Sequence, residues 1–132
     1  MDTSGGIRWL RVFLAGFLAE VLVIALVIPF ALLLGKNTLT YSAPAASFLA
    51  CFVFAIWVGR RLDSRFVLHG VLVGIVATLI YVASTRGRPE PPAYLVAHVL
   101  KLLGGATGGL VAARRHKPAQ QLDSPAGETS RP

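Results

Sequence analysis

The chain has 132 residues, of which 55% are hydrophobic and only 14% are charged, and its mean hydropathy is +0.65. Soluble domains average about 25% charged residues, so this composition excludes an ordinary soluble domain and is typical of an integral membrane protein. The net charge of +7 does not indicate a nucleic-acid partner, because most basic residues lie at the ends of apolar runs, where they set topology and contact lipid headgroups. We therefore expect the lipid bilayer as a partner and no nucleic acid.

The first apolar run, residues 12–34, contains a single carboxylate, Glu20. A helix over this run rises about 34 Å, which is enough to cross a hydrocarbon core of roughly 30 Å. The run is longer than the apolar core of a cleavable signal peptide, about 7–15 residues, so we expect it to remain as a membrane span. Residues 1–11 are expected to form a polar segment and an interfacial turn, and Pro29 is expected to kink the last turns of the span.

Three further apolar runs follow, with expected helices over residues 43–59, 66–83 and 93–113. Ser42 is placed to cap the second helix, with Pro44 in its first turn, and the prolines within residues 84–92 separate the third helix from the fourth. The sequence thus predicts an all-α fold, a four-helix transmembrane bundle over residues 12–113. Residues 114–132 are rich in Pro, Gln, Ser and charge, which predicts a disordered cytoplasmic tail.

Basic residues near the ends of the spans are distributed unequally, with eight on one side and three on the other. The positive-inside rule places the larger set in the cytoplasm, and an even number of spans then puts both the N- and C-termini there. The aromatic belt agrees, because both Trp residues fall at the inner ends of spans and all three Tyr residues at the outer ends. The larger set is Arg8, Arg11, Arg60, Arg61, Arg65, Arg114, Arg115 and Lys117, and the smaller set is Lys36, Arg86 and Arg88.

Small residues mark the helix faces that are expected to pack. Lipid tails are as apolar as leucine, so close packing over small residues has to hold membrane helices together. The third helix carries Gly70 and Gly74, and the fourth carries two overlapping GxxxG patterns. These patterns indicate a close helix contact, either inside one monomer or at a homo-oligomer interface. The glycines of the fourth helix are Gly104, Gly105, Gly108 and Gly109.

Glu20 has one candidate partner inside the membrane, Lys101 in the last apolar run. Glu20 lies about 14 Å along its helix from Arg11 and about 18 Å from Arg8, and Lys101 lies about 20 Å from Arg114 on the same side. The two charges are therefore expected at similar depth, as a buried ion pair that fixes which helix packs against which. Two alternatives remain, a carboxylate that gates protons or binds a cation, and a depth mismatch with the lysine snorkelling outward.

The two intramembrane histidines differ in their expected roles. His98 lies one turn before Lys101 and is expected to join Glu20 and Lys101 in one polar cluster, whereas His69 is expected at the inner interface. Their depths differ by something like 15 Å, which excludes a haem iron held by both. No motif of a hydrolase, metalloprotease or nucleotide-binding loop is present, so we expect no catalytic residues, no cofactor and no metal.

Two resemblances to known families can be stated on particular residues. The glycine and basic loop at Trp57-Val58-Gly59-Arg60-Arg61, the entry Leu68-His69-Gly70-Val71-Leu72-Val73-Gly74 and the glycine-rich run 104–109 resemble a group of small bacterial four-span proteins, the YrzE-like membrane proteins. This group has no established activity to carry over. Ala19-Glu20-Val21 resembles the first-helix motif of the small multidrug resistance exporters, which implies a proton and cation site at Glu20.

These observations lead to a functional expectation. The chain is expected to be a multi-pass protein of a bacterial cytoplasmic (inner) membrane, an accessory or structural component and not an enzyme. Its expected protein partners are further copies, in a homo-oligomer, or the members of a larger membrane complex. The alternative is a proton-coupled small-molecule transporter that uses Glu20, although Lys101 would neutralise the carboxylate that a cationic substrate needs.

Overall fold

The computed structural model describes residues 7–62, 64–89 and 91–122. In these ranges the chain forms four α-helices and one short 3-10 turn. Each of the four helices is long and apolar enough to cross a membrane, which is compatible with a small multi-pass membrane protein. The elements are α1 (Trp9–Leu34), η1 (Lys36–Thr38), α2 (Leu39–Gly59), α3 (Phe66–Thr85) and α4 (Pro92–Leu122).

Two of the helices begin three or four residues earlier than the sequence predicts. α1 starts at Trp9, so most of the expected interfacial turn is already helical. α2 starts at Leu39, which places Ser42 inside the helix and makes its assignment as a cap wrong. The reason is the short reversal between these helices: Gly35 ends α1 at a φ of 87°, a value that glycine adopts without strain, and η1 completes the turn in three residues.

The last helix continues beyond its predicted end. α4 runs to Leu122, so the prediction of disorder from residue 114 onward is wrong for residues 114–122. Arg, Lys, Gln and Ala are strong helix formers, and the loss of apolar residues therefore ends the membrane span but not the helix. The span itself is assigned to Pro92–His116. The expectations for residues 1–6 and 123–132 lie outside the described part of the chain.

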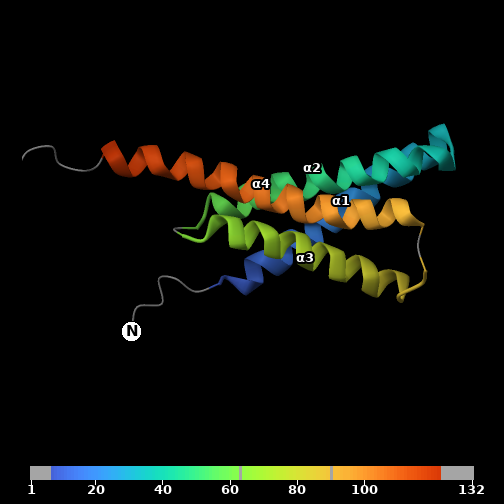
Figure 1. Cartoon of the computed structure of the whole chain (residues 1–132), viewed down its shortest axis with the longest axis horizontal. Helices are drawn as coiled ribbons and strands as arrows, with labels where there is room; N and C mark the ends of the chain where they lie inside the picture. The colour runs from blue at the N-terminus through green and yellow to red at the C-terminus, as the bar shows by residue number, and fades with distance from the viewer. Residues whose placement is uncertain (1–6, 63, 90, 123–132) are drawn as a thin grey trace, which may run out of the picture.

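The four helices lie side by side along one axis (Figure 1). The start of α1 and the end of α4 are at the same end of the bundle, which we call the terminal end. The α1–α2 and α3–α4 connections are at the opposite end, which we call the connection end. The chain therefore traverses the bundle four times and returns to the side on which it began.

The helices are arranged as a rhombus and not as a square. α1 packs on α2 and α3, and α4 packs on the same two helices, while α2 and α3 also contact each other. In the described part of the chain, no Cα atom of α1 lies within 8 Å of a Cα atom of α4. The first and last helices therefore do not pack directly against each other, and their backbones face each other across the interior.

The six predicted packing glycines lie where helix backbones meet. Gly104 and Gly108 face α2, and a Cβ atom added at Gly108 would lie 2.5 Å from the Phe52 carbonyl oxygen. The other four lie between α3 and α4, where Gly70 and Gly105 each face the other's carbonyl oxygen. A Cβ atom at Gly74 would lie 2.7 Å from the Lys101 carbonyl oxygen, and one at Gly109 would lie 2.5 Å from the Phe66 carbonyl oxygen. Both GxxxG patterns of α4 thus lie against other helices of the same chain.

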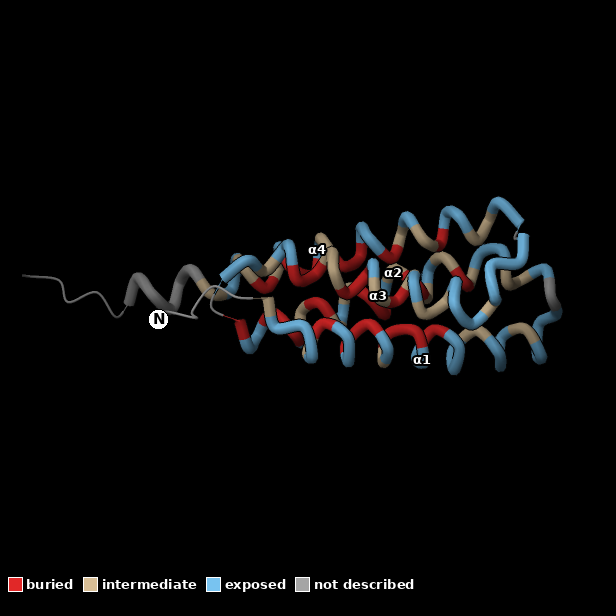
Figure 2. The backbone as a smooth tube through the Cα atoms, turned by 90° about the horizontal axis from the view of Figure 1, so that it is seen from below, coloured by how far each residue is buried: buried red, intermediate tan, exposed pale blue. Residues whose placement is uncertain are grey.

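Burial is concentrated in the terminal half and the middle of the bundle (Figure 2). One cluster of buried apolar residues includes Val12, Val58 and Val73, and a second, further along the helices, includes Ala19 and Cys51. α1 has no buried residue after Val23, although it continues for eleven more residues to Leu34. The connection half is therefore less tightly filled, and a cavity lies there.

Substitution of Gly105 tests the close approach of α3 and α4. We expect Gly105→Val to lower the free energy of unfolding by about 1–3 kcal/mol, because the added atoms would meet the Gly70 backbone and force the helices apart. Unfolding of the purified protein by sodium dodecyl sulfate in mixed micelles, followed by circular dichroism, measures this change. Thr107→Val, at an exposed position of the same helix, is the matched control. Equal stability of the two variants would contradict the packing described above.

Candidate functional site

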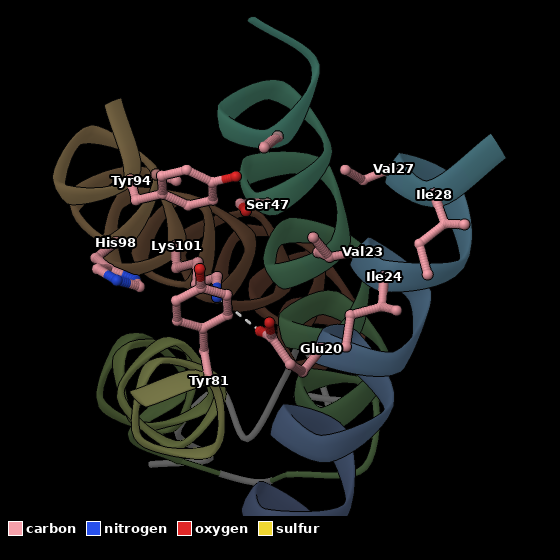
Figure 3. A pocket seen from close by; sticks show the side chains of 12 residues that line it. Glu20, Val23, Ile24, Val27, Ile28, Ser47, Tyr81, Tyr94, His98 and Lys101 are labelled. Carbon is pink, nitrogen blue, oxygen red and sulfur yellow. Dashed lines mark hydrogen bonds and ion pairs between the residues drawn. The ribbon is translucent and has the colours of Figure 1, made fainter. Parts of the chain in front are cut away.

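The predicted ion pair between Glu20 and Lys101 is confirmed. The Lys101 Nζ atom lies 2.6 Å from the Glu20 Oε2 atom, and each residue is only 2% exposed (Figure 3). Glu20 continues the buried face of α1 that carries Gly16 and Ala19, and Lys101 lies on the face of α4 that carries Ala97 and Gly105. Because the residues beside each charge are small, the neighbouring helices can approach closely and enclose the pair.

The ion pair connects two helices whose backbones do not touch. Lysine and glutamate have long side chains, and their combined reach closes the distance across the bundle between α1 and α4. The bundle around them is apolar, so each charge depends on the other for compensation. Loss of one partner would leave the other charge buried without an opposite charge.

Tyr81 is the part of this site that the sequence analysis missed. The sequence predicts it at the outer interface, but its ring lies over the Lys101 ammonium group, with Nζ 4.8 Å from the ring centroid. This is a cation–π geometry and adds a second favourable contact for the buried ammonium. The sequence does indicate this inward position, because Tyr81 lies on the same face of α3 as the small buried residues Gly74 and Ala77.

His98 lies beside the pair, as expected from its position one turn before Lys101. Its ring packs edge-on against Tyr81, with centroids 5.1 Å apart and planes at 60°. Tyr94, one turn before His98 in α4, also packs on Tyr81, and these two rings are stacked with their centroids 6.1 Å apart. The predicted polar cluster of Glu20, Lys101 and His98 is therefore joined through an aromatic group centred on Tyr81.

A cavity of about 170 Å³ adjoins the ion pair on the side of the connection end. We call it the ion-pair cavity. Apolar side chains of α1 form one wall, α2 contributes Ala43 and Ser47, and the aromatic group with Lys101 forms the facing wall (Figure 3). Glu20 also lines this cavity, and its second carboxylate oxygen, Oε1, is buried and has no hydrogen-bond partner among the described residues. The site thus combines a compensated charge pair with one unused acceptor.

His69 lies elsewhere and is more deeply buried than the sequence predicts. It is 2% exposed, and its Nδ1–H donates to the Arg65 carbonyl oxygen at 2.9 Å while Nε2 accepts from the Arg8 backbone N–H at 3.4 Å. The ring therefore connects the start of α1 to the start of α3. It is not among the residues that line the ion-pair cavity, so its contribution is to hold the terminal end together.

Comparisons with protein-family models, with curated proteins and with solved structures give no match. No group of three or more His, Cys, Asp or Glu side chains suited to a metal ion occurs within residues 7–62, 64–89 and 91–122. Inferences about function therefore start from two features, the ion pair and the cavity beside it.

A double-mutant cycle tests the energetic role of the pair. We expect Lys101→Met and Glu20→Met each to lower the free energy of unfolding by about 3–5 kcal/mol, because each leaves a buried charge without compensation. The double variant is expected to recover most of this loss, since both charges are then gone. Unfolding in mixed micelles measures all four proteins, with the exposed Arg114→Met as a control. Single variants as stable as the unchanged protein would contradict a compensated buried pair.

Proposed function

We propose that this chain is an accessory or structural protein of a bacterial cytoplasmic membrane, with both termini in the cytoplasm, and that it is not an enzyme. The observation that carries this proposal is the buried ion pair, in which each charged group has the other as its partner. An enzyme needs groups that are positioned to exchange protons or bonds with a substrate. A pair buried between four helices is instead suited to fixing the helix arrangement.

The charge distribution supports the proposed orientation. Arginines gather at the terminal end, on the first turns of α1, in the α2–α3 connection and at the end of the α4 span. The connection end carries few basic residues, among them Arg86 and Arg88. Short loops rich in Lys and Arg stay in the cytoplasm, so the terminal end is the cytoplasmic end in this proposal.

Cysteine labelling tests this orientation. Cys51 is fully buried, and Cys51→Ala provides a background without the native thiol. In that background we expect Asn37→Cys, exposed in the α1–α2 connection, to react with a membrane-impermeant maleimide in intact cells. Ser64→Cys, exposed in the α2–α3 connection, is expected to react only after the cells are permeabilised. The reverse pattern would overturn the proposed orientation.

The proposal also includes assembly, either as a homo-oligomer or within a larger membrane complex. The glycines of α3 and α4 already contact other helices of the same chain, so a protein partner would bind to a different surface. α1 offers such a surface, because it is the least buried of the four candidate spans and its outward side carries exposed Leu, Ile and Phe side chains along its whole length. In this proposal α1 faces the partner or the lipid, and α4 stays inside the bundle.

A proton-coupled transporter that uses Glu20 is the second candidate. It is favoured by one observation, the position of Glu20 among the residues that line the ion-pair cavity. A carboxylate with access to a cavity can bind a proton or a cation, as the resemblance to small exporters at Ala19-Glu20-Val21 implies. Lys101 opposes this role, since its ammonium group repels a cationic ligand.

Binding of a lipophilic cation distinguishes the two candidates. For the accessory protein we expect no saturable binding of tetraphenylphosphonium to the purified protein in lipid nanodiscs at any pH between about 6 and 8, because Lys101 already neutralises Glu20. Isothermal calorimetry at several pH values measures this. Saturable binding that strengthens with pH and is abolished by Glu20→Gln would contradict the accessory role and support the transporter.

A further inference from the structure

A cavity of about 210 Å³ lies at the terminal end, between the end of α2 and the end of the α4 span. We call it the α2–α4 cavity, and it shares no lining residue with the ion-pair cavity. Two of its lining residues are apolar and three are basic. They are Ile56, Ala112, Arg60, Arg115 and His116.

Close packing of α2 on α4 brings two arginines to this cavity. A Cβ atom added at Gly59 would meet the Ala112 side chain, so the end of α2 lies directly against α4 at this point. Arg60 follows Gly59 in the chain, and Arg115 lies one turn beyond Ala112 on the same face of α4. The helix contact therefore places two arginine side chains beside one cavity.

Positive charge is in excess around the α2–α4 cavity. Glu20 is the one carboxylate among the described residues, and it is buried against Lys101, away from this end. In the sequence, residues 56–66 and 108–118 contain six Lys and Arg residues and one acidic residue, Asp63, which lies outside the described residues. One carboxylate cannot neutralise this charge, and two arginines beside one cavity repel each other. An anion from outside the chain would relieve this repulsion.

The neighbours of these arginines in the chain lie outside the cavity. The Arg61 guanidinium group lies over the Trp57 ring, with Cζ 5.7 Å from the ring centroid. Arg114 is exposed and is not among the lining residues. Each arginine of the cavity is therefore adjacent in the chain to an arginine that carries the same charge at a different place.

The surroundings of the cavity favour a lipid over a soluble anion. The candidate spans of α2 and α4 end here, which is the level of the lipid headgroups. From Ile56, the half-buried side chains of Phe52 and Phe48 follow at intervals of four residues along one face of α2, toward the middle of the bundle. The two Phe rings are stacked with their centroids 6.1 Å apart and offer an apolar surface to an acyl chain. Basic pockets between membrane helices are known to bind phosphate headgroups.

We propose that the α2–α4 cavity binds an anionic phospholipid, with the phosphate group between Arg60 and Arg115 and an acyl chain along Phe52. Guanidinium groups donate paired hydrogen bonds to phosphate oxygens, which suits arginine to this role. Phosphatidylcholine carries the same phosphate group, but the arginines repel its choline group, so a lipid with a net negative charge binds more tightly. This site goes beyond the accessory role and does not depend on the orientation proposed above, because the cavity has the same residues on either side of the membrane.

A lipid titration tests the expected selectivity on the unchanged protein. The purified protein in detergent micelles is titrated with phosphatidylglycerol or with phosphatidylcholine of the same acyl chains, and native mass spectrometry measures the bound lipid. We expect the first phosphatidylglycerol to bind about tenfold more tightly than the first phosphatidylcholine, because only the second lipid brings a positive charge to the arginines. Inorganic phosphate, added as a competitor, is expected not to displace phosphatidylglycerol, because it lacks the acyl chains.

Paired arginine variants locate the site. Arg60→Gln and Arg115→Gln each remove a charge from the cavity, and we expect each to weaken phosphatidylglycerol binding about tenfold, the effect of one charge-assisted hydrogen bond. Arg61→Gln and Arg114→Gln are the matched controls, because they remove the same charge from adjacent residues outside the cavity. They are expected to leave binding nearly unchanged. All four positions are exposed, and circular dichroism reports whether each variant folds. The comparison of the two lipids on the unchanged protein stands even if a variant does not fold.

Three results would overturn the proposal. Equal binding of phosphatidylglycerol and phosphatidylcholine would mean that the charge of the headgroup is not recognised. Equal effects of the cavity variants and of their neighbours would mean that the lipid responds to the charge of the whole terminal end and not to this cavity. Displacement of phosphatidylglycerol by inorganic phosphate would show that the cavity takes a soluble anion.

Discussion

The rest of the structure depends on one interaction, the ion pair between a carboxylate on α1 and an ammonium group on α4. Apolar surface cannot select helix partners in a membrane, because a lipid tail satisfies it equally well. A charge buried in apolar surroundings does select a helix partner, since it is tolerated only next to an opposite charge. The pair therefore fixes both the depth and the rotation of α1 relative to the other three helices.

Glycine contacts and the ion pair connect different helices of the bundle. α4 packs backbone to backbone on α2 and α3 through glycines, and within the described residues α1 packs on α2 and α3 but not on α4. The space between α1 and α4 is then filled in two ways. In the terminal half and the middle it is closed by buried apolar residues and by the pair, whereas toward the connection end it opens into the ion-pair cavity. The cavity is thus a consequence of the same rhombic arrangement that the pair bridges.

Much of this could be predicted from the sequence. The four spans follow from apolar length, and the partnership of Glu20 and Lys101 follows from depth counted at 1.5 Å per residue. The predictions that were wrong depended on how the helices pack against one another and on where a helix ends. Counting depth does not say whether two helices touch, so the separation of α1 and α4 was missed. The place of Tyr81 near the end of α3 indicates an interfacial residue, but its ring lies over the Lys101 ammonium group. The apolar sequence ends before α4 does, because the residues that follow include strong helix formers.

The contact between the two charged groups can be measured directly in lipid. Solid-state NMR on protein labelled with ¹⁵N at lysine Nζ and with ¹³C at the glutamate carboxyl group reports dipolar coupling between these atoms. In a chain where Lys36 and Lys117 are replaced by Arg, Lys101 supplies the only lysine signal. The account predicts strong coupling to one glutamate carboxyl carbon, as expected for the 2.6 Å Nζ–Oε2 contact, and its loss in Glu20→Gln. The absence of coupling in the protein that retains Glu20 would contradict it.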